Sequence, residues 1–89
     1  MTAPLPLVYV EWVDSATVHG WHSLDELQRD CTSVLMQSVG WIVKETDDTL
    51  MLSAHLHKET DEHDAVRMAA DATAIPKVAI TMRRVLRKR

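Results

Sequence analysis

The amino-acid sequence predicts a mainly β protein, a small five-stranded antiparallel barrel with one short helix after the first strand. Three observations lead to this prediction: stretches rich in β-branched and aromatic residues, a hairpin pattern over residues 38–57, and a helix-capping pattern at Ser23. A chain of 89 residues forms a single domain. We expect a flexible leader at 1–6, the barrel domain at 7–86 and a basic tail at 87–89.

The first strand is predicted in the stretch LVYVEWV, which covers residues 7–13. Successive side chains of a strand point to opposite faces, so this stretch has two distinct faces. Val8, Val10 and Trp12 share the first face. The second face carries Leu7, Tyr9, Glu11 and Val13.

A short helix is predicted after this strand. Ser23 followed by Glu26 matches a capping box, which predicts a helix from Leu24 to about Asp30. Because so short a helix is unstable alone in water, we expect it to pack on another surface. Trp21, just before it, has two interpretations: it anchors the loop and helix to the barrel, or it stacks on a nucleic-acid base.

The central hairpin comprises a long strand over residues 32–43, a turn, and a return strand over 49–57. Gly40 lies within the first of these strands, where a glycine often marks a bend. Trp41 lies in the strand interior, and we assign it to the core together with the Trp of the first strand. One face of the return strand carries Leu50, Leu52, Ala54 and Leu56, and the other carries Met51, Ser53, His55 and His57.

The last part of the chain is less uniform. Residues 64–74 fit a helix or a strand equally well, because alanines alternate with β-forming residues. Pro76 marks a break, since proline removes a ladder donor, and residues 79–86 predict a final strand. Strands in this order form a strongly bent antiparallel sheet, and closure into a barrel removes most exposed edges.

Charge is distributed unevenly along the chain. Residues 1–74 hold all 13 acidic residues and only four basic ones, a net charge of −9, whereas residues 75–89 hold six basic residues and no acidic one. Three interpretations stay open: a solvated tail, a basic strand that binds phosphates, or a tail that meets the acidic body of a neighbouring subunit.

Several classes of function receive no support from the sequence. Cys31 is the only cysteine, so no intrachain disulfide forms, and neither a secretion signal nor a transmembrane run is recognisable. We therefore expect a cytoplasmic protein. The sequence has no glycine-rich phosphate loop and no Cys-His signature. His55 and His57 share a strand face near acidic residues and could bind zinc, but the His-x-His-x-Asp-His spacing of binuclear zinc hydrolases is absent, and we favour a solvent-facing strand end. We expect a protein that is not an enzyme and that uses no cofactor or metal.

The chain resembles the small Sm-like and SH3-like barrels in two stretches. Residues 38–52, with Gly40 and the Asp47-Asp48 turn, resemble the bent second strand, acidic turn and third strand of an Sm-like protein. Ile75-Pro76-Lys77 resembles the tight turn between the last two strands. This stretch stands where the Hfq-like members carry a Tyr-Lys-His signature. A second difference is that the helix here follows a strand, whereas the Hfq-like members begin with their helix.

A second resemblance concerns small accessory proteins of tailed bacteriophages. It rests on the strand that ends in Asp14-Ser15 and on Gly20-Trp21 before a helix. The two resemblances together imply a homo-oligomer that binds RNA or nucleotides at subunit junctions, and a role in host–virus interaction in the host cytoplasm.

Five residues are candidates for ligand binding. Arg83 and Arg84 are the expected anion contacts, and His55, His57 and Trp21 are the expected stacking contacts. The leading hypothesis is a non-enzymatic, phage-encoded protein that sequesters a small nucleotide at the subunit interfaces of an oligomer, in an anti-defence role. Alternatives are an Sm-like RNA-binding ring and an inhibitor of a host protein that uses an acidic face. That face comprises Asp47, Asp48, Glu59, Asp61, Glu62 and Asp64.

Overall fold

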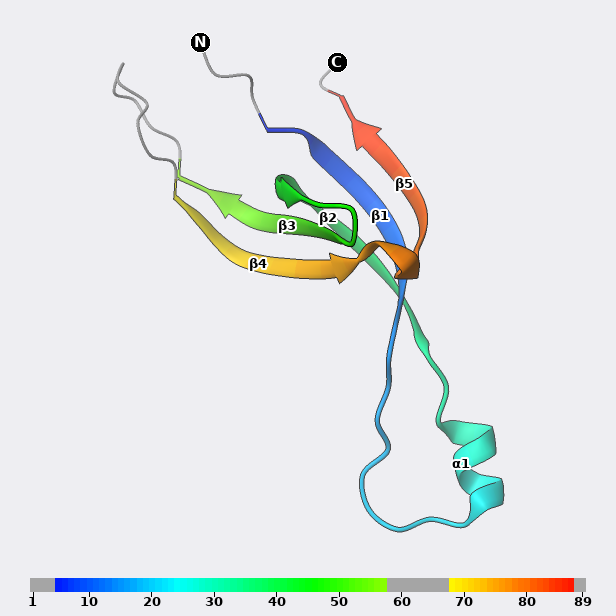
Figure 1. Cartoon of the computed structure of the whole chain (residues 1–89). Helices are drawn as coiled ribbons and strands as arrows, with labels where there is room; N and C mark the ends of the chain where they lie inside the picture. Colours follow the sequence, from blue (N-terminus) through cyan, green and yellow to red (C-terminus); the bar gives the residue numbers. More distant parts are fainter. Residues whose placement is uncertain (1–4, 58–67, 88–89) are drawn as a thin grey trace, which may run out of the picture.

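A computed structural model describes residues 5–57 and 68–87 of the protein. The described residues form one antiparallel sheet in the order β4-β3-β2-β1-β5, so the mainly β prediction is confirmed (Figure 1). The α-helix, α1, follows the first strand, and a short 3-10 helix, η1, links the last two strands. The elements are β1 (Leu7–Asp14), α1 (Leu24–Asp30), β2 (Val34–Glu45), β3 (Thr49–Leu56), β4 (Ala69–Pro76), η1 (Lys77–Ala79) and β5 (Ile80–Leu86).

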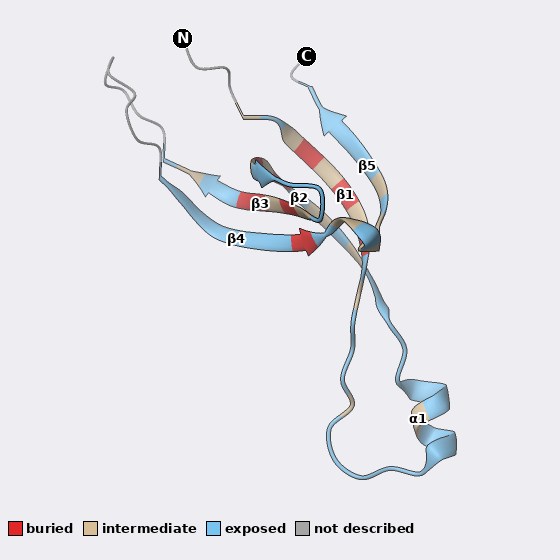
Figure 2. Cartoon of the chain, viewed as in Figure 1, coloured by how far each residue is buried: buried red, intermediate tan, exposed pale blue. Residues whose placement is uncertain are grey.

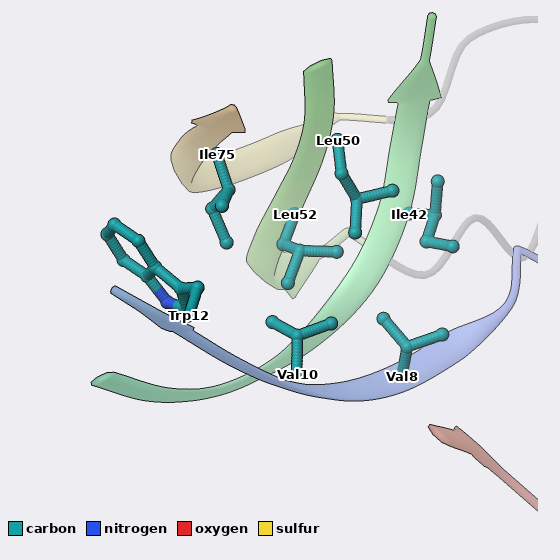
Figure 3. Packing of buried hydrophobic residues seen from close by; sticks show 7 residues of the cluster. All are labelled: Val8, Val10, Trp12, Ile42, Leu50, Leu52 and Ile75. Carbon is teal, nitrogen blue, oxygen red and sulfur yellow. The ribbon is translucent and has the colours of Figure 1, made fainter. Parts of the chain in front are cut away.

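The core lies inside the fold of this bent sheet. Side chains of β1 face those of β3 and β4 across the concave side, where they meet in one cluster (Figure 3). Trp12 closes one end, and its indole nitrogen donates a hydrogen bond to Ser38 Oγ at 3.0 Å, which satisfies the polar atom of a buried ring. The cluster comprises Val8, Val10, Trp12, Ile42, Leu50, Leu52 and Ile75.

The bend of β2 depends on Gly40. A β-carbon at this position would lie 2.9 Å from the carbonyl oxygen of Ser53 and 3.0 Å from the β-carbon of Leu52. Only a residue without a side chain allows β3 to approach so closely. β2 pairs with β1 from Val34 to Trp41, and it pairs with β3 from Trp41 to Glu45.

Contacts between loops hold the two halves of the sheet together. The backbone amide of Lys77 in η1 donates a hydrogen bond to the carbonyl oxygen of Asp48, in the turn between β2 and β3. However, β4 and β5 are the two edges of the sheet, and no hydrogen-bonded ladder joins them in the described residues. The predicted closed barrel is therefore not confirmed.

Helix α1 begins and ends where the capping pattern predicts. Ser23 is the N-cap, and its hydroxyl accepts a hydrogen bond from the amide of Glu26 at 3.2 Å. None of the helix residues is buried, so the described residues do not supply the surface on which the helix is expected to pack. Trp21 is fully exposed, so it does not anchor the helix to the sheet either.

The strand predictions are confirmed with local corrections. Leu50 and Leu52 are buried as expected, but Ala54 is exposed because β3 has passed the end of its pairing with β2. Within the ambiguous stretch 64–74, the residues from Ala69 onward form β4, and the rest lie outside the described residues. Trp41 is only half-buried and is not in the core cluster. No helix in the described ranges is long and apolar enough to cross a membrane.

Candidate functional site

Arg83 and Arg84, the two predicted anion contacts, point to opposite faces of β5. Arg83 lies opposite Val10 on the concave side, and its two terminal nitrogens each lie 2.9 Å from a carboxylate oxygen of Glu45. The ammonium of Lys77 lies 2.7 Å from the same carboxylate. The bidentate pair therefore connects β5 to the end of β2, and it occupies the guanidinium of Arg83.

These contacts change the titration of Glu45. Hydrogen bonds from Arg83 and then from Lys77 hold the pKa of the Glu45 carboxyl at about 2, well below the ordinary value of 4.5. The hydrogen bond to Glu45 also raises the pKa of Arg83. The pair is thus fully ionised at neutral pH and links the sheet's two halves on its concave side.

Arg84 lies on the outer face of the sheet, directly opposite Tyr9 of β1. The Tyr9 hydroxyl donates a hydrogen bond to the Glu11 carboxylate at 2.8 Å and accepts one from the side-chain amide of Gln37, also at 2.8 Å. The bond to Glu11 raises the pKa of the Tyr9 phenol, with a smaller contribution from desolvation. The ring is therefore held in one orientation beside Arg84, with its hydroxyl protonated.

Trp41 extends this arrangement along the outer face. It lies opposite Leu7, while Tyr9 lies opposite Val39, so Trp41 and Tyr9 are diagonal neighbours on paired strands. Diagonal side chains of an antiparallel pair are about 7–8 Å apart, within the reach of aromatic rings. We refer to Tyr9, Gln37, Trp41 and Arg84 as the outer-face cluster.

The two predicted histidines lie at the far end of β3. His55 Nε2 is 3.3 Å from a carboxylate oxygen of Asp71 on β4, and the backbone amide of His57 donates to the carbonyl of Met68 at 2.7 Å. A pocket of about 350 Å³ opens here. Its lining comprises His55, Leu56, His57, Met68, Ala69 and Ala70.

The backbone beside these histidines is irregular. Asp71 has a φ of 57°, a left-handed conformation that aspartate tolerates better than most residues. The fully buried Ser53 hydroxyl lies 2.7 Å from the carbonyl oxygen of Ala70 and 2.9 Å from that of His55. Its single proton is shared between these two acceptors, which fixes the strand end without creating an open polar site.

The predicted ligand residues do not converge within one chain. The arginines lie on β5 at one edge of the sheet, and the histidines lie where β3 pairs with β4 at the other edge. Trp21 lies in the excursion between β1 and β2 (Figure 1). No group of three or more potential metal ligands exists among the described residues.

Tyr9, Gln37 and Trp41 were not identified from the sequence as candidate ligand-binding residues. The alternation of LVYVEWV placed Tyr9 on the face opposite the core residues, which was a usable signal. Its neighbours, however, come from β2 and β5, so the cluster follows only from the strand order and register.

Comparisons of the chain with protein-family models, curated proteins and solved structures find no match. The resemblances to Sm-like barrels and to phage accessory proteins therefore stay predictions.

Proposed function

We propose that the protein is a non-enzymatic binding protein that holds a small nucleotide on the outer face of its sheet. The observation that carries this proposal is the position of Arg84 directly opposite Tyr9, with Trp41 as the diagonal neighbour of that tyrosine. A cation next to one aromatic side chain, with a second aromatic side chain one strand further along the sheet, combines phosphate binding with base stacking.

Each member of the outer-face cluster has a distinct role in this proposal. Arg84 makes no ion pair among the described residues, so its guanidinium is available to a phosphate. Tyr9 and Trp41 offer ring surfaces to a base. Gln37 and Glu11 hold the tyrosine ring in place through its hydroxyl.

A small nucleotide fits the charge of the molecule better than a long nucleic acid. The acidic excess of residues 1–74 repels an extended polyanion, while one exposed arginine suffices for a localised phosphate. The Glu11 carboxylate beside Tyr9 also repels a ligand that would place many phosphates near that residue.

Binding without turnover is part of the proposal. The only hydroxyl in the outer-face cluster belongs to Tyr9, and its hydrogen bond to Glu11 keeps it protonated. A protonated phenol is a poor nucleophile, so the bound nucleotide is sequestered unchanged. This is the behaviour that the resemblance to phage accessory proteins implies.

The finer architecture belongs to the same proposal. The strand order, the 3-10 link between β4 and β5, and the Glu45 ion pairs support an Sm-like or SH3-like barrel that is split between its edge strands. We propose that the protein acts as a homo-oligomer, since a domain this small gains stability by burying further surface.

Fluorescence titration tests the proposal. The purified chain is titrated with a panel of mononucleotides, cyclic dinucleotides and short single-stranded oligonucleotides, and tryptophan quenching is recorded. Arg84→Ala and Tyr9→Ala should each weaken nucleotide binding about tenfold or more, because each removes a charge-assisted bond or a stacking contact.

Lys44→Ala is the matched control, because Lys44 is also an exposed cation of the sheet and lies outside the cluster. The Lys44→Ala variant should bind the nucleotide with the same affinity as the wild type. Wild-type affinity in Arg84→Ala contradicts the proposal, and preference for oligonucleotides over every mononucleotide and dinucleotide favours RNA binding instead.

A further inference from the structure

The segment between β1 and β2 projects away from the sheet. Figure 1 shows residues 15–33, including α1, as a long excursion at one end of the molecule, and we call this segment the arm. The described protein measures 61 × 25 × 25 Å, with a radius of gyration of 17.6 Å. A compact domain of 89 residues has a radius of gyration of about 12 Å. The arm therefore makes the chain far longer than its core requires.

The arm has no core of its own. Figure 2 shows that the buried residues are confined to the sheet and that the arm is almost entirely exposed. The side chain of Trp21 is fully exposed, and that of Leu24 is 75% exposed. A seven-residue helix is not stable in water through capping alone, so α1 needs a surface to cover its apolar side chains.

The charge of the arm limits what that surface can be. Asp25, Glu26 and Asp30 outnumber the single cation Arg29, which binds Asp30 at 3.0 Å. Glu26 is occupied by His22, whereas no described residue forms an ion pair with Asp25. A second arm carries the same negative charge, so two arms repel each other, and a basic partner surface is favoured.

The basic end of β5 is such a surface. Arg87 is exposed, and the sequence continues with Lys88 and Arg89. The apolar side chains of Val85 and Leu86 are 49% and 36% exposed on the same stretch. One side of β5 has no paired strand among the described residues, so the stretch offers an open edge as well as charge.

A chain's own arm does not reach its own basic end. Ile80, at the start of β5, lies opposite Trp12 near the base of the arm, while Leu86 lies opposite Leu7 at the other end of β1. The two features therefore lie at opposite ends of the sheet. We propose that the arm of one copy docks, head to tail, on the basic β5 end of a second copy. This inference does not depend on nucleotide binding.

Light scattering of the full-length chain across a concentration series tests the docking. The wild type should form a dimer or larger assembly. Trp21→Ala with Leu24→Ala should raise the dissociation constant by about 30-fold or more, as expected for central interface anchors. Since neither residue is buried, the circular dichroism spectrum of the sheet should be unchanged.

Charge reversal identifies the docking partner. Asp25→Lys and Arg87→Glu should each weaken assembly about fivefold, and mixing the two variants should restore it between unlike copies. Three outcomes overturn the proposal: a monomeric wild type, assembly that survives the arm variants, or assembly that ignores Arg87→Glu. The nucleotide affinity of the arm variants should stay at the wild-type value, so failure here is distinct from failure of the nucleotide proposal.

Discussion

Gly40 is the residue on which the bend of β2 depends, because a side chain there would collide with the backbone of β3. The nearest obstacle is the carbonyl oxygen of Ser53, part of a paired strand, which has little freedom to move. Position 40 therefore requires glycine because of this close approach, and not because of the general preference of glycine for turns.

Gly40→Ala should lower the free energy of unfolding by about 1–3 kcal/mol, the usual cost of overpacking a tight site. Urea denaturation followed by tryptophan fluorescence measures the change. Val39→Ala, at the neighbouring exposed position, should cost about 0.5 kcal/mol or less. Equal effects of the two substitutions would contradict the close approach of β2 and β3.

Glu45 provides a pH-dependent contact between the two halves of the sheet. Its pKa in the folded protein is about 2 and lies below the ordinary value of 4.5. A lowered carboxylate pKa stabilises the fold above the unfolded-state pKa, and this stabilisation disappears as the pH falls through the folded-state pKa. The contribution of Glu45 is therefore complete above about pH 4.5 and is lost between about pH 4.5 and pH 2.

The prediction is tested by denaturation of the wild type and Glu45→Gln between pH 2 and 7. The wild type should be the more stable protein at neutral pH, and the difference should shrink below about pH 4.5. A difference for Glu45→Gln that is constant over the whole range would rule out the ion-pair explanation.

Among the elements, β1 and β3 show which part of the fold the sequence can predict. Alternation of apolar residues correctly placed Val8, Val10 and Leu50 on the buried face, because the two-residue period of a strand is a local property. It failed at Ala54, which is exposed because β3 outruns its pairing with β2. The residue at which two strands stop pairing depends on the neighbouring strand, and the local sequence of one strand does not encode it.

The helix illustrates the same division. The capping pattern at Ser23 predicted the bounds of α1 correctly, since a cap is made by residues within one turn. The surface that covers the helix could not be predicted, because the position of the helix depends on the path of the preceding loop, and no helix residue is buried within the described chain. The outer-face cluster needed still more information, since its members come from three strands.

Leu50 of β3 provides a test at the scale of the elements. It is fully buried in the core cluster, so Leu50→Ala should lower the free energy of unfolding by about 2–5 kcal/mol. Val78→Ala, in the exposed η1 turn, should change it by about 0.5 kcal/mol or less. Chemical denaturation at constant protein concentration measures both. A small effect at Leu50 would mean that β3 is not part of the core.

At the scale of the whole molecule, three regions have different tasks. The concave side of the sheet holds the core and the Glu45 ion pairs, and it gives the protein its stability. The convex side carries the outer-face cluster, where we propose that a nucleotide binds. The arm is separate from both and holds no core residue, so we expect variants there to leave the core unchanged.

Native mass spectrometry of the purified full-length chain tests the proposed nucleotide binding most directly. We predict a bound mass that corresponds to a nucleotide, and denaturation should release that nucleotide chemically unchanged. Arg84→Ala should lose the bound mass, and Lys44→Ala should retain it. A wild-type protein that carries no nucleotide even after incubation with the nucleotide panel, or that releases only hydrolysed products, would contradict the account.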